Sequence, residues 1–299
     1  MINFVKHSKI YYIFSAVLLA VSLFSLLFFG LKWGIDFTGG SIIEVEFSES
    51  VLDNAMVKQQ LADLSLGEVI VQPTGEKGII LRLKSVDEET HRKVLEKLGS
   101  AQERRFEAIG PIIGQELTKK TRVAVVLALL SIIIYITFAF AKLSWPMKSW
   151  QYSIAALLAL FHDILIPLGA FAVLGRFYGA EMTIPIIAAL LTVLGYSIND
   201  TVVVYDRIRE NLLRRKFSTF EETVNQSLNQ TLSRSINTVA TVLLTLFAIY
   251  FFGGETLRYF SLALIVGIVS GMYSSICIAS PLMVSWAKWQ EKKKISLFR

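Results

Sequence analysis

The sequence predicts an α-helical polytopic membrane protein with six transmembrane helices and one α+β domain outside the membrane. Three observations lead to this prediction. The 299 residues are 54% hydrophobic and only 18% charged, which is too apolar for a soluble protein of this length. Six apolar stretches reach the roughly 20 residues that a helix needs to cross a bilayer. The one long segment between the first two stretches instead alternates strand-like and helix-like patterns.

The apolar stretches divide the chain. They run over residues 10–31, 123–141, 151–174, 184–205, 236–252 and 260–286. The first is too long for a signal peptide and has no small-x-small cleavage pattern after it, so we expect an uncleaved anchor. The expected parts are an N-terminus at 1–9, a first helix at 10–31, an external domain at 32–122, a five-helix bundle at 123–286 and a basic tail at 287–299.

Lysine and arginine residues predict the orientation of the chain, because cytoplasmic loops are enriched in them. Basic residues precede the first stretch, follow the fourth and the sixth, and occur between the second and third at Lys142 and Lys148. The short loops on the other side carry only Arg176 and Arg258. We therefore expect both termini in the cytoplasm and the domain at 32–122 outside. No aromatic–basic interleaving accompanies the net charge of +6, so we expect no nucleic-acid binding.

The segment between the first two stretches reads as a small α+β domain. Four strands are expected at SIIEVEF, EVIVQP, GIILRLK and RRFEAIG, and two amphipathic helices at LDNAMVKQQLADL and DEETHRKVLEKL. The order strand–helix–strand–strand–helix–strand is that of a ferredoxin-like domain. The sequence has a single cysteine, Cys277, and no visible nucleophile–base pair, so we interpret this domain as a binding or docking module.

A carboxylate and an arginine approach the membrane from the same side in the fourth and fifth stretches. Asp200, in GYSINDT, lies about 9 Å from the cytoplasmic end of its stretch at 1.5 Å per residue. Arg234, in SRSINT, precedes the apolar run of the fifth stretch, and its long side chain can reach inward. Three interpretations stay open for the two residues: a static ion pair, a proton or ion site, or no interaction at all. Desolvation can cancel the attraction of a buried pair, which favours the functional interpretation.

Three further polar residues are secondary candidates: Asn199 beside Asp200, and His162 with Asp163 in the third stretch. Adjacent helix positions are about 100° apart, so we expect that His162 and Asp163 cannot both point at one partner. A single His is more typical of a satisfied interior residue, and one His with one Asp makes a poor metal site. We therefore expect no metal. No active-site motif supports proteolysis by Asp163 and Asp200.

Glycines mark two kinds of position. Gly267 and Gly271 in the sixth stretch have GxxxG spacing, which permits close approach of helices. A second set flanks the external domain and is interpreted equally well as hinges or as plain turns. This set comprises Gly34, Gly39, Gly40, Gly110 and Gly114.

Six motifs now occur in order along the chain. They are GIDFTGG after the first stretch, IGPIIGQEL before the second, HD in the third, GYSINDTVVVYDRIREN in the fourth, SRSINT at the fifth and GMYSSICIASP in the sixth. Together they resemble the bacterial SecF family, and the resemblance covers essentially the whole chain. The single block resembles SecF alone rather than a fused SecD–SecF protein.

The resemblance implies a membrane subunit of the resistance-nodulation-division superfamily in the bacterial plasma membrane. Members of the SecF family pair with SecD, associate with the Sec channel and YajC, and assist late export of unfolded polypeptides using the proton-motive force. In the family, the residues that correspond to Asp200 and Arg234 are implicated in the proton path. The resemblance thus implies no enzyme activity and no cofactor, with protons as the coupling ion and sodium as an alternative.

Two other functions stay open at this point. A small-molecule or lipid exporter of the same superfamily would have a broad substrate cavity and usually larger external domains. A non-transporting scaffold of the translocon would keep its activity when Asp200 is neutralised.

Overall fold

The computed structural model describes residues 1–48, 53–75, 77–99, 101–139 and 146–297. Lys142, which the sequence analysis assigns to a loop, lies outside the described residues. The chain divides into two compact units. A helical unit combines Met1–Lys32 with Val125–Arg299, and an α/β unit spans Trp33–Ala124.

Six helices within the described residues are long and apolar enough to cross a membrane, which confirms the predicted membrane class. They are α1 (Ser8–Phe29), α5 (Pro111–Ala139), α6 (Ser149–Tyr178), α7 (Ile184–Leu213), α8 (Phe220–Phe252) and a last helix, Leu257–Lys293. The last helix is made of α9 (Glu255–Ser274), a π-helical segment η2 (Ser275–Ala279) and α10 (Ser280–Leu297).

The fifth helix is longer than the sequence predicts. α8 begins at Phe220, well before the predicted stretch at 236–252, and the side chain of Thr219 caps its first turn. This early part of α8 is polar because it binds the N-terminal segment: Asn225 Oδ1 accepts a hydrogen bond of 2.8 Å from the backbone N–H of Phe4. Hydropathy detects only the apolar part of a helix, so the predicted stretch at 236–252 corresponds to the last part of α8.

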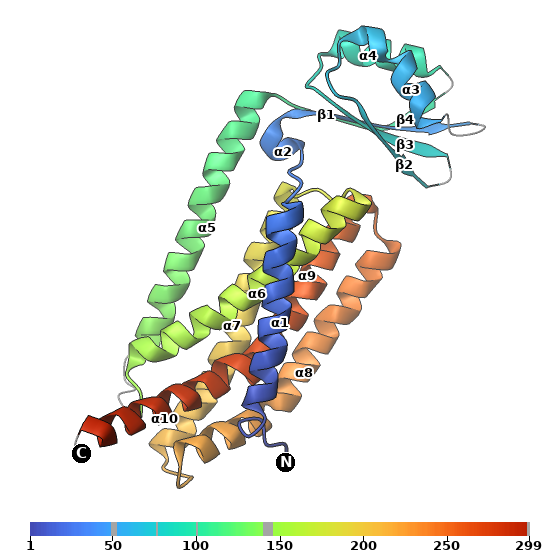
Figure 1. The fold of residues 1–299 in the computed structure, drawn as a ribbon. Helices are drawn as coiled ribbons and strands as arrows, with labels where there is room; N and C mark the ends of the chain where they lie inside the picture. Colours follow the sequence, from blue (N-terminus) through green and yellow to red (C-terminus); the bar gives the residue numbers. More distant parts are fainter. Residues whose placement is uncertain (49–52, 76, 100, 140–145, 298–299) are drawn as a thin grey trace. The chain divides into compact units, whose positions relative to one another are not determined.

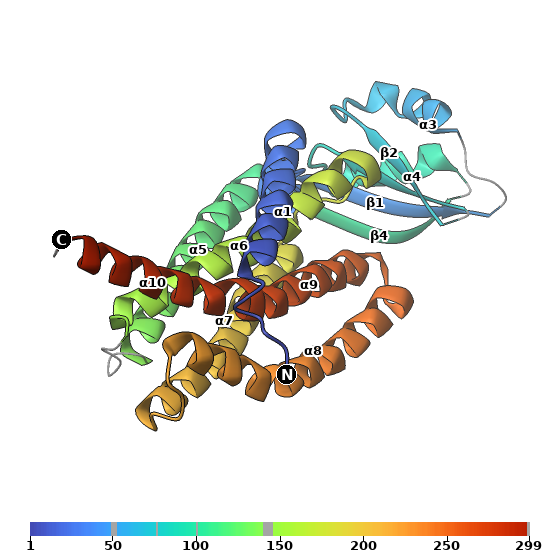
Figure 2. The same ribbon diagram turned by 60° about the horizontal axis from the view of Figure 1, so that its bottom comes forward.

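The helical unit has its centre in α6, α7 and α9, and α1 packs along α6 (Figures 1 and 2). A Cβ atom on Gly169 of α6 would lie 2.5 Å from Cα of Ser22 in α1, so the two helices touch backbone to backbone. Two buried apolar clusters fill the interior, one around Tyr152 and Tyr205 and one around Phe171. These contacts place α6, α7 and α9 close enough to share polar side chains.

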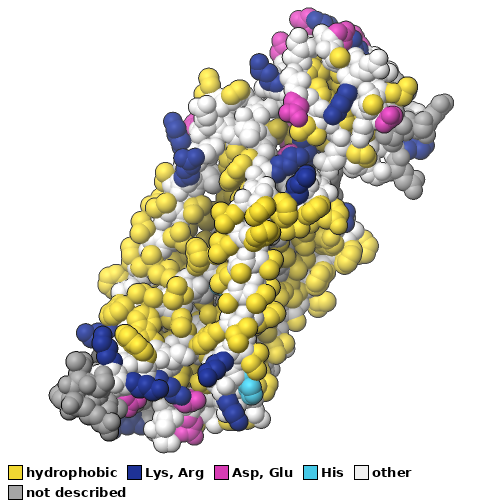
Figure 3. Space-filling model, in the orientation of Figure 1, with side chains coloured by type: hydrophobic (Ala, Val, Ile, Leu, Met, Phe, Trp, Pro, Cys, Tyr) yellow, Lys and Arg dark blue, Asp and Glu magenta, His cyan; other side chains and the backbone are white. Residues whose placement is uncertain are grey.

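The outward faces of the helices are apolar. In α5, only 6% of the most apolar 18-residue stretch is buried. In the last helix, 61% of the corresponding stretch is buried. Hydrophobic side chains cover the helices on the face shown in Figure 3, and lysines and arginines gather where the helices end. This distribution is that of a bundle in lipid, where the exposed surface meets hydrocarbon and charge collects at the interfaces.

The α/β unit contains a four-stranded antiparallel sheet within its described residues. Its elements are a short helix α2 (Ile35–Thr38), β1 (Gly40–Phe47), α3 (Asn54–Gln60), the 3₁₀ turn η1 (Ala62–Leu64), β2 (Ile70–Thr74), β3 (Gly78–Leu83), α4 (Glu88–Leu98) and β4 (Ala101–Ile109). The strand order across the sheet is β2-β3-β1-β4. Helices α3 and α4 cover one face (Figure 1), where Val57 and Val94 pack against Ile43 and Leu81.

The predicted turn or hinge glycines lie where the sheet and α5 begin. Gly39 and Gly40 have φ angles of 73° and 143°, which side-chain-bearing residues rarely adopt. A Cβ atom on Gly39 would lie 2.9 Å from Cα of Pro111, and one on Gly114 would lie 3.1 Å from the N atom of Gly39. Gly34 caps α2, and Gly110 directly precedes α5. Turn geometry and close backbone packing therefore account for Gly39, Gly40 and Gly114.

Candidate functional site: a polar network inside the helical bundle

The helical spacing of α7 places several polar residues on its buried face. Ser197, Asp200 and Thr201 are buried, and Asp200 and Thr201 follow Ser197 by three and four positions, so both lie on the side of the helix that carries Ser197. Asn199 is exposed and lies outside this face. Among the predicted residues of α7, the structure therefore brings Asp200 into the interior and leaves Asn199 out.

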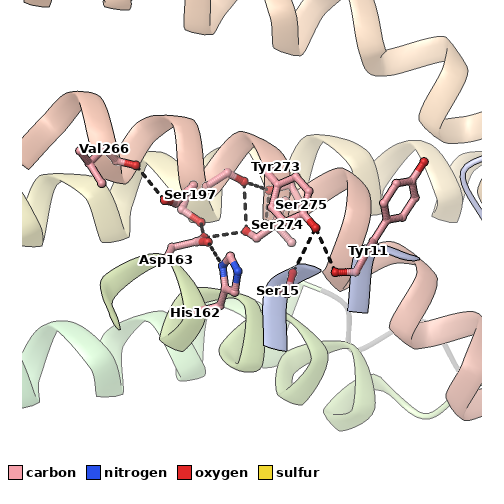
Figure 4. Close-up of polar contacts among 12 residues, drawn as sticks. Tyr11, Ser15, His162, Asp163, Ser197, Val266, Tyr273, Ser274 and Ser275 are labelled. Atoms are coloured by element: carbon pink, nitrogen blue, oxygen red, sulfur yellow. Dashed lines mark hydrogen bonds and ion pairs between the residues drawn. The ribbon is translucent and has the colours of Figure 1, made fainter. Parts of the chain in front are cut away.

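Asp163 of α6 forms the first polar centre, shown in Figure 4. Its side chain is fully buried, with 0% exposure. Oδ2 accepts hydrogen bonds from Ser197 Oγ of α7 at 2.5 Å and from Ser274 Oγ of α9 at 2.7 Å. Three central helices thus meet at one carboxylate.

His162 contacts Asp163 directly: the distance from His162 Nδ1 to Asp163 Oδ1 is 3.0 Å. The sequence argument that adjacent helix residues cannot share a partner overlooked that they can bind each other. The imidazole is 2% exposed, and its Nε2 has no hydrogen-bond partner among the described residues. His162 is therefore not the fully satisfied interior histidine that the sequence favours.

Asp200 forms the second polar centre. The carboxylate is 9% exposed, and its Oδ1 accepts a hydrogen bond of 2.5 Å from Ser235 Oγ of α8. Within the described part of the chain, Oδ2 has no hydrogen-bond partner, although Ser275 of η2 lies close to the carboxylate. The neighbouring Thr201 shares a hydrogen bond of 2.8 Å with Ser275 Oγ.

Arg234 lies one residue before Ser235, on the exposed side of α8. The ion pairs along the described part of α7 join charged residues near its C-terminal end and do not join Asp200 to Arg234. One residue step turns a helix by about 100°, so Arg234 leaves α8 in a different direction from Ser235, although its charge is close enough to interact electrostatically with Asp200. Ser235 thus makes the direct contact with Asp200 that was expected from Arg234, and Arg234 forms no ion pair with Asp200 among the described residues.

Two glycines of α9 bring this helix onto α7. A Cβ atom on Gly271 would lie 2.9 Å from Cβ of Ser197, and one on Gly267 would lie 2.3 Å from a methyl group of Val193. The predicted GxxxG spacing therefore corresponds to real close packing beside Asp163. Immediately afterwards the helix widens into η2, a form that is rare and often occurs at functional sites.

Serine hydroxyls form much of this network, and the sequence analysis did not assign them to the candidate site. Ser197, Ser235, Ser274 and Ser275 supply the hydroxyl groups of the network. The available signals were the helical spacing of Ser197 from Asp200, the place of Ser235 next to Arg234, and the place of Ser274 and Ser275 beside the GxxxG glycines. Among the described residues, no three His, Cys, Asp or Glu side chains gather as a metal site would require. The polar side chains present are carboxylates, hydroxyls and one imidazole, which are groups able to donate and accept hydrogen bonds.

Family models match most of the chain. The model described as protein export membrane protein SecD/SecF, C-terminal, matches residues 90–289. The model described as SecD/SecF GG motif matches residues 24–51. The second match covers the end of α1 and the glycine turn before β1.

Full-length relatives are similar to the chain. The protein translocase subunit SecF of Thermobaculum terrenum is 42% identical over 315 residues, which cover 100% of this chain and 97% of that one. The protein translocase subunit SecF of Synechocystis sp. is 35% identical over 310 residues, covering 96% and 95%.

Solved structures of SecDF share the fold. The crystal structure of SecDF from Thermus thermophilus matches with a TM-score of 0.84 and 34% identity, covering 96% of this chain and 39% of that chain. A crystal structure of SecDF in a super-membrane-facing form matches with a TM-score of 0.70 and 35% identity, covering 99% and 40%. The chain therefore spans less than half of either SecDF chain.

The fold and the buried polar network define a multi-pass membrane protein of the transport class. More particularly, the chain belongs to the SecD/SecF family of protein export membrane proteins.

Proposed function

We propose that this chain works as a SecF-type subunit in a complex with a SecD partner, where proton passage through the helical bundle drives late steps of protein export. The observation that carries the proposal is the hydrogen bonding of the two buried carboxylate oxygens of Asp200. One carboxylate oxygen is held by Ser235, and the other is buried without a hydrogen-bond partner among the described residues. A charge in such a position is costly, so binding and release of a proton there change the stability of the helix arrangement.

Arg234 supplies the second part of the mechanism. Because it lies one residue from Ser235, exchanging Ser235 for Arg234 at Asp200 requires α8 to turn or its side chains to rearrange. In the proposed cycle, charged Asp200 attracts Arg234 and protonated Asp200 releases it. One elementary charge crossing 100 mV supplies about 2.3 kcal/mol, which is enough to shift a two-state equilibrium by tens-fold.

The α/β unit is proposed to lie outside the membrane and to carry the mechanical output. Its strand order and its two helices on one face support assignment to the ferredoxin-like class. The proposal assigns it to binding the emerging unfolded polypeptide, with both chain termini in the cytoplasm of a bacterial cell. The name SecDF of the solved relatives supports a SecD partner. The Sec channel and YajC follow from the family resemblance.

The coupling ion is proposed to be the proton, with sodium as the alternative. The donor set supports the proton: the buried groups are carboxylates, hydroxyls and an imidazole, and the described residues hold no acidic cluster for a cation. The working groups move protons and make or break no covalent bond of a substrate. We therefore propose a transport subunit that is not an enzyme and needs no cofactor.

The test is export of a secreted reporter in cells depleted of their own SecF and supplied with Asp200→Asn. Asparagine has nearly the same size and still accepts from Ser235, but it cannot carry a proton. We expect export to fall to the level of depleted cells, while the membrane level of the chain and its co-purification with SecD stay normal. Thr192→Val, at an exposed position of the same helix, is the matched control.

Normal export by Asp200→Asn would overturn the proton mechanism and favour the scaffold. Loss of small-molecule efflux with unchanged reporter export would favour the exporter of the same superfamily.

A further inference from the structure

A second carboxylate in the same bundle has no role in the step at Asp200. We propose that Asp163 is a second proton-carrying residue, which exchanges a proton with His162. Its protonation changes the hydrogen bonding of η2 through Ser274. This inference rests on the proposed function and deepens it, because it adds a second proton-carrying residue to the same proposed path.

The first support is the charge balance around Asp163. The carboxylate is fully buried, and its one ion-pair contact among the described residues is with His162. An isolated buried charge is unfavourable, so the two residues are stable either as a charged pair or as a neutral pair. Both states hold the same single proton, on His162 in one and on Asp163 in the other. At 3.0 Å the two atoms are within proton-transfer distance.

The second support is the open nitrogen of His162. Nδ1 faces Asp163, whereas Nε2 is buried and has no hydrogen-bond partner in the described chain. Buried polar side-chain atoms normally have a partner, so an open one marks a position where a proton or water can be exchanged. His162 thus contacts Asp163 through Nδ1, and its Nε2 is available to exchange a proton with the rest of the proposed proton path.

The third support is that Ser274 has a choice of acceptor. Its hydroxyl can donate to Asp163 Oδ2 at 2.7 Å or to the carbonyl oxygen of Gly271 at 3.1 Å. Ser197 donates to the same Oδ2. When His162 Nδ1 gives its proton to Asp163 Oδ1, the carboxyl group loses its negative charge and Oδ2 becomes a weaker acceptor, so one of its two hydroxyl donors is released. Ser274 then donates to the carbonyl oxygen of Gly271 instead.

The connection to η2 follows from the same carbonyl. Gly271 O also accepts from Ser275 Oγ at 2.9 Å, and Ser275 bonds Thr201, the neighbour of Asp200. Ser274 and Ser275 therefore compete for this carbonyl oxygen. Through this competition, protonation of Asp163 affects η2 and the turn of α7 that carries Asp200. A π-helical segment is a natural element to respond, because it can return to α-helical hydrogen bonding.

Few other groups compete for the proton. The other titratable side chains around this centre in the described chain are Asp200 on α7, Tyr273 on α9, Cys277 in η2 and Tyr11 on α1. Phenols and thiols ordinarily stay protonated at neutral pH, so Asp200 is the remaining carrier.

The experiment compares five variants in the same depleted cells, each checked for membrane level and SecD co-purification. Asp163→Asn keeps the acceptor for both serines, and His162→Asn keeps a donor near Nδ1, but neither can carry the proton. We expect reporter export to fall by about tenfold or more in each, since a positioned proton carrier contributes at least ~100-fold to a transfer step. Asp163→Glu should recover part of the export.

Ser274→Ala and Ser197→Ala form the matched pair, because each removes one hydroxyl from the same carboxylate oxygen. We expect the larger loss for Ser274→Ala, since Ser274, unlike Ser197, has a hydrogen bond to the Gly271 carbonyl as well as to Asp163. A purely structural role predicts the reverse, because Ser197 makes the shorter hydrogen bond. This pair decides the question if Asp163→Asn does not assemble.

Normal export by Asp163→Asn or by His162→Asn, with Asp200→Asn inactive, would overturn this inference and leave the proposed function intact. Normal export by Asp200→Asn would instead remove the proposed function itself.

Discussion

Individual hydroxyl groups decide how the buried aspartates are held. Each aspartate receives a hydrogen bond of 2.5 Å from one serine, Ser235 for Asp200 and Ser197 for Asp163. These serines come from other helices than the aspartates they bind. At Asp200, the hydrogen bond comes from the neutral Ser235 and not from the neighbouring charged residue Arg234.

The first residue-scale prediction concerns Ser235. Ser235→Ala leaves Asp200 without its donor, and a hydrogen bond to a charged group contributes about 1.5–3 kcal/mol. We expect reporter export between that of the wild type and that of Asp200→Asn. Ser235→Thr keeps the hydroxyl and serves as the control. Wild-type export by the alanine variant would show that this hydrogen bond is dispensable.

The second residue-scale prediction concerns pH and the first turn of α4. Asp87 Oδ1 accepts from the backbone N–H of Thr90 at 2.9 Å. Hydrogen bonds from the side chain and from the backbone of Thr90 hold the pKa of Asp87 below its ordinary value of 3.8. A lowered pKa in the folded state means that the cap stabilises α4 above pH 3.8 and is lost as the pH falls through the folded pKa.

We expect amide protection in α4 of the whole chain, corrected for intrinsic exchange, to fall between pH 5 and pH 3. Asp87→Asn keeps a capping side chain without the charge, so its protection should lose this pH dependence. Equal pH dependence in both proteins would assign the effect to another group.

At the scale of elements, small residues set the distance between helices and thereby the geometry of the polar network. The backbone of α9 at Gly271 lies against Ser197 of α7, which in turn holds Asp163. Packing and polar contacts are therefore coupled at this point.

Gly271→Ala tests this coupling. The added Cβ would lie 2.9 Å from Cβ of Ser197, and relieving such overpacking typically costs about 1–3 kcal/mol. We expect lower thermal stability of the purified chain and lower export, because Ser197 is pushed from Asp163. Gly195→Ala, on α7 with no atom within 4 Å of the added Cβ, is the control and should be close to neutral. Equal behaviour of the two variants would contradict the packing argument.

At the scale of the whole molecule, the chain builds two units with separate cores. The core of the α/β unit contains Ile43, Leu81 and Val94, all with 0% exposure, and the helical unit has its own clusters. Separate cores let one unit change without unfolding the other.

Leu81→Ala should destabilise the α/β unit by about 2–5 kcal/mol, the usual range for a buried leucine. We expect hydrogen exchange of the whole chain to show lower protection in the sheet and unchanged protection in α6 and α7. Ile70→Ala, at a position that is 37% exposed, should have a much smaller effect. A parallel loss of protection in the bundle would show that the two units unfold together.

The sequence by itself determined the six membrane helices, the order of strands and helices in the α/β unit, and the buried position of Asp200. Hydrophobic length and periodicity are local properties, so a local pattern can predict them. Only the tertiary structure decided that Ser235 rather than Arg234 contacts Asp200, and that His162, Ser197 and Ser274 meet at Asp163. Those contacts depend on the rotation of each helix about its axis, and a step of one residue changes that direction by about 100°.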